Sequence, residues 1–167
     1  MTVMTLDTAT PAEIYEVALA MRRDDFLEFS AVAWADTREA LADQITDIYG
    51  GRADVLCARA KGIGPVAIGG ALELRPKVAT LLFFATPYFR QIALPLTRFI
   101  RNSLLPKLGA AGVHRVEAVS MCGNEAAHRW IETLGLKPET GPLLNYGKGG
   151  ESFIQFSGDP RVRAAGD

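Results

Sequence analysis

The stretch that decides the fold is Met121-Cys-Gly-Asn-Glu-Ala-Ala-His-Arg-Trp-Ile-Glu-Thr-Leu-Gly-Leu136. It predicts the end of a strand, then a short helix that has Asn124 as its N-cap and stops at Gly135. The apolar face of this helix, at 3–4-residue spacing, consists of Ala127, Trp130, Ile131 and Leu134. The helix is therefore expected to be half-buried between two strands.

Two capping boxes predict helices in the N-terminal part of the chain. Thr10-Pro-Ala-Glu13 begins a helix over about 11–22, and Asp36-Thr-Arg-Glu39 begins a second helix that stops at Gly50-Gly51. The charges of Arg22-Arg-Asp-Asp25 predict a solvated loop between the two helices, with acceptor selection as the alternative role. The apolar segment 26–34 that follows serves either the core or a homodimer interface.

The remainder of the chain changes to strand periodicity. Three antiparallel strands are predicted by residues 55–60, 66–74 and 78–86. A helix over about 93–105, with a further turn from Pro106, leads to the strand 113–121, which implies a parallel crossover. The segments 143–146 and 151–156 predict a closing hairpin around Gly147-Lys-Gly-Gly150.

Length, charge and cysteine content exclude several classes of protein. The 167 residues suit a single domain, predicted over 1–158, followed by a flexible tail over 159–167. A net charge of -1 gives no reason to expect a nucleic-acid partner, and no apolar run approaches the roughly 20 residues that span a membrane. A cytoplasmic protein is expected. Two cysteines and two histidines, none clustered, predict no metal site.

The pattern Asn124-x-x-Ala127-x-x-Trp130, followed by Leu134-Gly135-Leu136, resembles the last conserved block of the GNAT (Gcn5-related) N-acetyltransferase superfamily. The hydrophobic strand over 78–86, Pro87 and Arg90 fit the same register. The resemblance implies an α/β (α+β) fold. Its sheet is mixed and mostly antiparallel, with a central splayed pair of parallel strands and helices on both faces.

The resemblance also implies a site for acetyl-coenzyme A between the splayed strands. The backbone of Phe83, Phe84, Ala85 and Thr86 would hold the pantetheine arm. The pyrophosphate would be held by Arg90 and the amides of Gln91, Ile92, Ala93 and Leu94. The helix that starts after Asn124 would contact the cofactor through Asn124, Ala127 and Trp130, with Asn124 using its side-chain amide.

The sequence departs from the superfamily pattern at the loop and at the catalytic positions. The usual Arg/Gln-x-x-Gly-x-Gly/Ala is Arg90-Gln-Ile-Ala93-Leu-Pro95 here, and Pro95 has no N–H to donate. Ile131 stands where many members have a tyrosine that protonates the thiolate. Glu73 is a candidate base acting through water, or an exposed strand-end charge. Tyr146 is a candidate acid, or an ordinary tyrosine at the sheet margin.

Two functions follow from these residues. The first is an acetyl-coenzyme A dependent N-acetyltransferase acting on a small-molecule or peptide amine, by direct attack. The alternative is a catalytically degenerate GNAT-like protein. Ile68-Gly69-Gly70 and the apolar segment 82–86 also resemble GNAT-like proteins of tailed phages, including the internal virion protein A of T7-like phages. That resemblance implies a role in virion assembly or as a protein-binding module, with phage structural proteins as partners and the virion as location.

Overall fold

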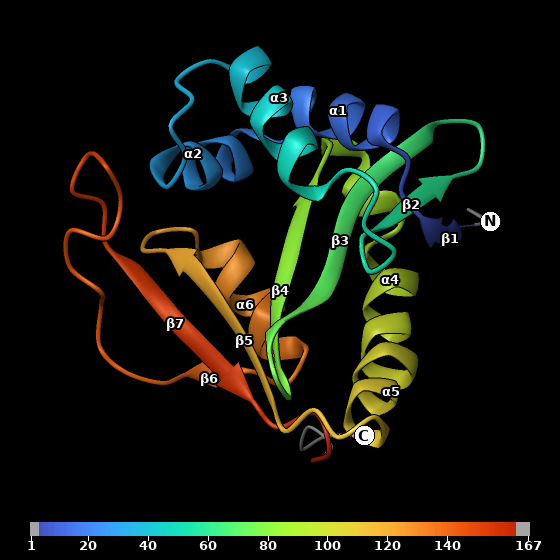
Figure 1. Cartoon of the computed structure of the whole chain (residues 1–167), viewed down its shortest axis with the longest axis vertical. Helices are drawn as coiled ribbons and strands as arrows, with labels where there is room; N and C mark the ends of the chain where they lie inside the picture. Colours follow the sequence, from blue (N-terminus) through green and yellow to red (C-terminus); the bar gives the residue numbers. More distant parts are fainter. Residues whose placement is uncertain (1–3, 163–167) are drawn as a thin grey trace. The chain divides into compact units, whose positions relative to one another are not determined.

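The computed structural model describes residues 4–162, which form two compact units. The first unit consists of Met1–Gly70 and Leu82–Leu96, and the second of Ala71–Leu81 and Thr97–Asp167, each over its described residues. Strands β3 (Gly64–Arg75) and β4 (Val78–Ala85) contribute residues to both units. The seven strands follow the order β1-β2-β3-β4-β5-β7-β6 across the sheet (Figure 1).

The first unit begins with β1 (Met4–Thr8), which pairs antiparallel with β2 (Leu56–Ala60); β2 in turn pairs antiparallel with β3. Helices α1 (Pro11–Leu19) and α3 (Arg38–Tyr49) lie side by side in this unit (Figure 1). Their apolar stripes supply the fully or almost fully buried side chains of Ile14, Val17, Leu41 and Ile45. The helical spacing of these residues, visible in the sequence, is what buries them on one side.

The predicted helix starts are largely confirmed. Thr10 and Glu13 form the complete capping box of α1. Helix α1 ends at Leu19, three residues earlier than expected. The prediction of Asp36 as the cap of α3 is wrong, because the Thr37 side chain accepts the hydrogen bond from the Ala40 amide. Gly50 follows the last residue of α3, as predicted.

A helix that the sequence patterns did not predict, α2 (Arg23–Ala31), lies between α1 and α3. Its nine residues include only two buried ones, Asp25 and Ala31, so it lacks the apolar stripe by which helices are recognised. The apolar segment 26–34 does not lie wholly in the core, since Trp34 is 95% exposed and Val32 54% exposed.

Glu13 couples the start of α1 to the sheet through a bidentate ion pair. Its carboxylate accepts from Arg59 Nε at 2.7 Å and from Nη2 at 2.8 Å, in addition to the Thr10 amide. The hydrogen bonds from the Arg59 guanidinium, opposed by burial and aided by the Thr10 amide, hold the pKa of Glu13 below its usual value. The charged carboxylate therefore stabilises the folded state.

We expect Glu13→Gln to lower the free energy of unfolding at pH 7 by about 1 kcal/mol, because a charge-assisted pair to a partly exposed partner is lost. A carboxylate whose folded pKa is lowered contributes stability above its unfolded pKa of about 4.3 and loses it as the pH falls through the folded pKa. Urea unfolding at pH 7 and pH 3 should therefore show a smaller difference at pH 3. Glu16→Gln, on the exposed side of α1, is the control. A difference that did not change between the two pH values would contradict the charge pairing.

The second unit contains the parallel pair that the sequence predicts. Strand β5 (Arg115–Met121) pairs in parallel with β4 over Val78–Thr80 and Arg115–Glu117. On its other side β5 pairs antiparallel with β7 (Phe153–Gly158), whose second partner is β6 (Lys137–Pro138). The sheet is thus mixed and mostly antiparallel with one parallel pair. This confirms the predicted α/β fold class.

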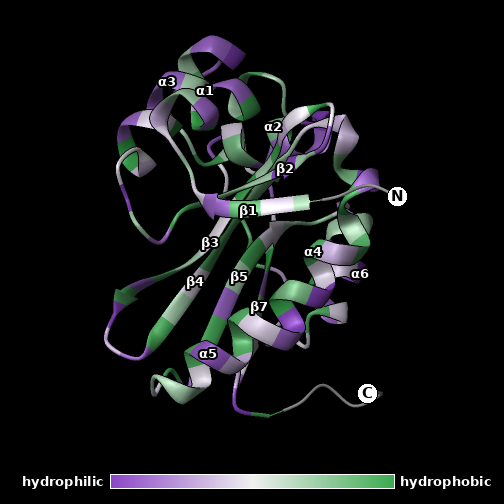
Figure 2. Cartoon of the chain, turned by 90° about the vertical axis from the view of Figure 1, so that its right-hand side faces the viewer, coloured by the Kyte–Doolittle hydropathy of each residue, from purple (hydrophilic) through white to green (hydrophobic). Residues whose placement is uncertain are grey.

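A longer helical run than predicted follows β4. The 3₁₀ helix η1 (Pro87–Gln91) is followed, after Ile92, by α4 (Ala93–Phe99). Helix α4 continues without a break into the π-helix η2 (Ile100–Leu104) and then α5 (Leu105–Ala110). Both hydrophobic and hydrophilic residues appear along α4 and α5 (Figure 2). The further turn expected from Pro106 is α5, which begins one residue earlier and has this proline in its first turn. The Leu105 amide donates to Ile100 O, which gives the wider π turn.

The end of the chain also differs from the prediction. Residues 143–146 are not a strand; they meet β7 through an isolated bridge between Leu143 and Phe153. The Gly147–Gly150 loop is tight, since the Tyr146 and Gly147 amides both donate to Glu151 O at 3.0 Å. Of the predicted tail, residues 159–162 are described, and Arg161 forms an ion pair with Asp159 at 2.7 Å. The remaining tail residues lie outside the described part.

The two cysteines are free thiols in the described chain. Cys57 is fully buried in β2, and burial, with a smaller contribution from the Glu13 charge, raises the pKa of its thiol to about 12. A thiol with this pKa is protonated at neutral pH, so Cys57 is a packing residue and not a nucleophile. Over residues 4–162, none of the helices has the length and apolar character that a membrane crossing needs.

Candidate functional site

The predicted cofactor strand is the end of β4, in the first unit. Phe84, Ala85 and Thr86 are buried there, and Phe83 is half-buried. The Thr86 amide donates to Val66 O of β3 at 2.8 Å. Because successive residues of a strand direct their N–H and C=O groups to opposite edges, the N–H and C=O of Ala85 face away from β3. This is the edge on which a bound chain would have to pair.

Both backbone groups of Ala85 are already bonded at that edge. The Ala85 amide donates to Asp25 Oδ2 at 2.9 Å, and the Arg22 amide donates to Ala85 O at 2.8 Å. The Asp25 carboxylate also accepts hydrogen bonds from Nε and Nη2 of Arg22, at 2.9 and 3.0 Å. We call these two residues, with their bonds to Ala85, the Arg22–Asp25 clasp.

The Arg22–Asp25 clasp corrects the prediction of a solvated charged loop. Asp25 is 5% exposed, and Arg22 places its guanidinium 4.9 Å from the Phe89 ring centroid and 5.7 Å from that of Phe83. The i,i+3 spacing of an arginine and an aspartate was the available sequence signal for this pair. It did not reveal the partner, Ala85, which lies 60 residues further along the chain.

The predicted phosphate loop supplies fewer donors than its length suggests. The Ile92 amide donates to Phe89 O at 3.0 Å and so closes the end of η1, and Pro95 has no amide hydrogen. Arg90 is exposed, as is Gln91, whereas Ile92 is fully buried. An anion at this loop would therefore meet the exposed guanidinium of Arg90.

The predicted cofactor residues of α6 (Glu125–Thr133) belong to the second unit. Trp130 donates its indole N–H to Thr97 Oγ1 of α4 at 2.9 Å, which fixes the ring between the two helices. Ala127 is half-buried on the same helix. His128 is a packing residue whose Nε2 lies 3.0 Å from Met121 O and whose ring contacts Phe156. Gly135 ends this segment with a φ of 102°, as its left-handed role predicts.

Asn124 differs from its predicted capping role. It occupies the N-cap of α6, but its side chain makes no capping hydrogen bond. The residue is 8% exposed, and its Nδ2 is buried without a hydrogen-bond partner. A buried amide nitrogen without an acceptor lowers the stability of the folded state by about 1–3 kcal/mol. Helix formation alone therefore does not explain why Asn124 is placed here.

The two weak catalytic candidates lie at the periphery of the second unit. Glu73 is exposed and accepts from the Lys77 amide at 2.7 Å, which stabilises the turn between β3 and β4. Tyr146 is 45% exposed in the turn before β7, with its ring centroid 4.8 Å from that of Phe153. The described contacts give neither residue a proton-transfer partner.

Glu117, in β5, has two ion-pair partners. Its carboxylate pairs with Arg115 at 2.8 Å and with Arg75 at 3.0 Å. Burial raises the pKa of Glu117, but the two arginines outweigh it and leave the pKa below its usual value. Glu117 is therefore a charged structural residue, not a proton donor.

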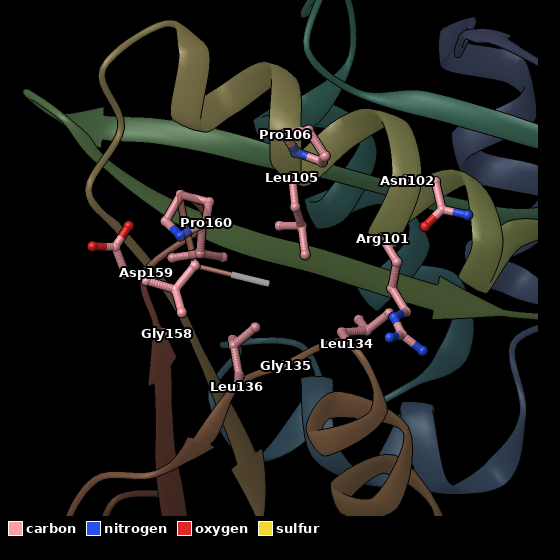
Figure 3. A pocket seen from close by; sticks show the side chains of 12 residues that line it. Arg101, Asn102, Leu105, Pro106, Leu134, Gly135, Leu136, Gly158, Asp159 and Pro160 are labelled. Atoms are coloured by element: carbon pink, nitrogen blue, oxygen red, sulfur yellow. The ribbon is translucent and has the colours of Figure 1, made fainter. Parts of the chain in front are cut away.

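A separate cavity of about 410 Å³ lies within the second unit, and none of the predicted site residues lines it. Leu105, Leu134 and Leu136 surround it together with Arg101 and residues 158–160 (Figure 3). Described residues of the predicted tail thus form one of its walls. Part of this wall packs near Gly109, where a Cβ would lie 3.2 Å from Pro160 O.

Comparison with known proteins gives a result for the fold alone. No protein-family model matches the chain, and no curated protein matches it. Among solved structures it is similar to the ribosomal-protein-S18-alanine N-acetyltransferase of Escherichia coli, with 18% identity, a TM-score of 0.65 and coverage of 99% of this chain and 97% of that one.

Two further solved structures are similar over nearly their whole lengths. One is a GNAT-family acetyltransferase from Bacillus anthracis, with 13% identity, a TM-score of 0.69 and coverage of 97% and 100%. The other is a putative acetyltransferase from Salmonella typhimurium with its cofactor acetyl-CoA, with 19% identity, a TM-score of 0.67 and coverage of 99% and 98%. The chain therefore has the fold of the GNAT acetyltransferases.

Proposed function

We propose that this protein is an acetyl-coenzyme A dependent acyltransferase whose acceptor is an amine of a small molecule or a peptide. The similar structures support the reaction class, since their names include a protein-alanine N-acetyltransferase and a spermidine N-acetyltransferase. The Salmonella typhimurium protein was solved with acetyl-CoA, which supports the choice of acyl donor.

The observation that carries the proposal is the unpaired Nδ2 of Asn124. A buried donor without an acceptor is rare in folded proteins, and a ligand oxygen is one of the groups that satisfies it. Acetyl-coenzyme A offers amide, hydroxyl and phosphate oxygens. We assign Asn124 Nδ2 as a donor to the cofactor, with Ala127 and Trp130 on the same helix as neighbouring contacts.

The backbone of β4 is assigned to the pantetheine arm, and the region after it to the phosphates. Residues 83–86 present strand backbone with an extended geometry, which pairs with an amide chain. The charge of the exposed Arg90 attracts a diphosphate, and residues 91–94 lie in the same loop.

The chemistry needs little from the protein beyond orientation. The amine nitrogen bonds to the thioester carbonyl carbon and loses a proton, the carbon–sulfur bond breaks, and the leaving thiolate takes up a proton. Ile131, 9% exposed, cannot donate that proton, and Glu73 and Tyr146 are the candidates that the sequence offers in its place. Holding the two reactants in place is itself worth several orders of magnitude in rate, so solvent can move the protons.

Asn124→Ala should weaken coenzyme A binding about tenfold, the effect of one lost hydrogen bond in a buried site. The melting temperature of the ligand-free protein should fall little or rise, because the side chain removed has an unsatisfied donor and no capping bond. Isothermal titration with acetyl-coenzyme A and with coenzyme A measures the affinity, and a thermal scan measures the stability.

Arg90→Ala tests the phosphate end of the same site. The affinity of this variant for coenzyme A should be lower than that of the wild type. The difference should be larger at low salt than at moderate salt, because the contact is electrostatic. Lys61→Ala removes an exposed positive charge from the turn between β2 and β3 and is the matched control. Absence of heat and of a thermal shift at millimolar coenzyme A in the wild-type protein would refute the proposed donor.

A further inference from the structure

The Arg22–Asp25 clasp occupies the backbone groups to which the proposed function assigns the pantetheine arm. Ala85 N–H is taken by Asp25 Oδ2 and Ala85 C=O by the Arg22 amide. Both bonds lie on the edge of β4 away from β3, since the adjacent Thr86 amide is bonded to Val66 O. A ligand that pairs with Ala85 therefore has to replace the clasp.

The attachment of α2 to β4 is chiefly polar. Asp25 and Ala31 are its only buried residues, and the N-cap residue, Arg22, makes no side-chain capping bond. The apolar contact to β4 is the edge-to-face pair of Phe29 and Phe84, with ring centroids 5.4 Å apart. Such a pair is worth about 0.5–1.5 kcal/mol beyond its buried area. Little apolar surface therefore opposes the release of α2.

Arg38 of α3 holds the start of α2 through two contacts, one to the residue before the N-cap and one to the first turn. Arg38 of α3 donates to Met21 O at 2.7 Å, and its guanidinium lies 4.8 Å from the Phe26 ring centroid. Met21 itself is 2% exposed. The Met21 carbonyl and the Arg22 N–H belong to one planar peptide group, so release of the Arg22 amide from Ala85 also requires that peptide group to turn or to shift relative to Arg38.

An extended amide chain can replace the clasp bond for bond. Its N–H would donate to Ala85 O in place of the Arg22 amide, and its C=O would accept from Ala85 N in place of Asp25 Oδ2. The pantetheine arm has two such amides. We propose that the Arg22–Asp25 clasp blocks the pairing edge of β4 in the ligand-free protein. Binding of coenzyme A displaces it and releases the first turn of α2 from Ala85. This step rests on the function proposed above.

Asp25→Ala removes the acceptor of Ala85 N–H and the partner of Arg22 together, and should bind coenzyme A at least about fivefold tighter than the wild type. The reason is that the apparent dissociation constant equals the intrinsic one divided by the fraction of molecules in which the site is open. Ligand-free Asp25→Ala should melt at a lower temperature, because a backbone donor loses its acceptor. Asp24→Ala removes an exposed carboxylate from the same helical turn and should leave the affinity unchanged. Equal or weaker binding by folded Asp25→Ala would overturn the proposal.

Hydrogen–deuterium exchange of the wild-type protein provides a test that needs no variant. Coenzyme A should increase exchange in residues 23–31, where the Phe26 amide now donates to Arg22 O, although ligand binding commonly decreases exchange. Unchanged or decreased exchange there, in a sample that shows binding heat, would refute the release of α2. Absence of heat from both the wild type and Asp25→Ala would instead refute the proposed cofactor, and displacement by it as well.

Discussion

Phe84→Ala should lower the free energy of unfolding by about 3–5 kcal/mol, the largest effect we expect from a single substitution in this chain. Phe84 is fully buried in β4, and its ring packs edge-to-face with that of Phe29. Removal of the ring leaves a cavity that the strand cannot close without breaking its own pairing. Equilibrium unfolding in urea measures the loss.

Tyr88→Ala is the matched control for Phe84→Ala. It removes an aromatic ring of similar size four residues away, from a side chain that is 54% exposed. Its effect should be below about 1 kcal/mol. A loss of similar size for both variants would mean that the ring of Phe84 is not packed as described.

Gly69→Ala should lower the free energy of unfolding by about 1–3 kcal/mol, because the added methyl group has no room. A Cβ at Gly69 would lie 2.8 Å from Leu82 O and 3.4 Å from Phe83 Cδ2. The carbonyl belongs to a neighbouring strand, so it cannot rotate away as a side chain would. Relief of this contact would displace Leu82 and Phe83, which should also weaken coenzyme A binding.

Gly141→Ala provides the control, since a Cβ there meets nothing within 4 Å and the residue has no positive φ. Its stability should equal or slightly exceed that of the wild type. Unfolding measurements that gave both glycine variants the same stability would show that β3 and β4 are not closely apposed at Gly69. The 2.8 Å between a Cβ at Gly69 and Leu82 O indicates that the two backbones approach closely at this position.

Features that depend on neighbours in sequence were the ones that could be predicted. The Thr10 and Glu13 capping box, the glycine stop at Gly135 and the strand spacing of β2 to β5 each follow from interactions within a few residues. The parallel pair of β4 and β5 follows from the helix that joins them. For this reason the fold class was accessible from the sequence.

Features that depend on contacts with backbone far away in the sequence could not be predicted. Helix α2 was missed because its inward face presents a carboxylate to Ala85, and no periodicity records such a partner. The missing capping bond of Asn124 could not be predicted either, because Asn at an N-cap normally accepts a bond from the first turn. The site residues, the single domain over 1–158 and the cytoplasmic location stay predictions, as do a homodimer and the phage-assembly alternative.

The chain has two tryptophans, and their surroundings differ greatly. Trp34 is 95% exposed after α2, whereas Trp130 is hydrogen-bonded to Thr97 on the helix that Asn124 begins. Replacing Trp34 with phenylalanine would therefore leave a single indole, whose emission reports on α6 alone. The remaining tryptophan is thus a fluorescent probe on the helix to which we assign cofactor contacts. Its emission can report cofactor binding without any attached label.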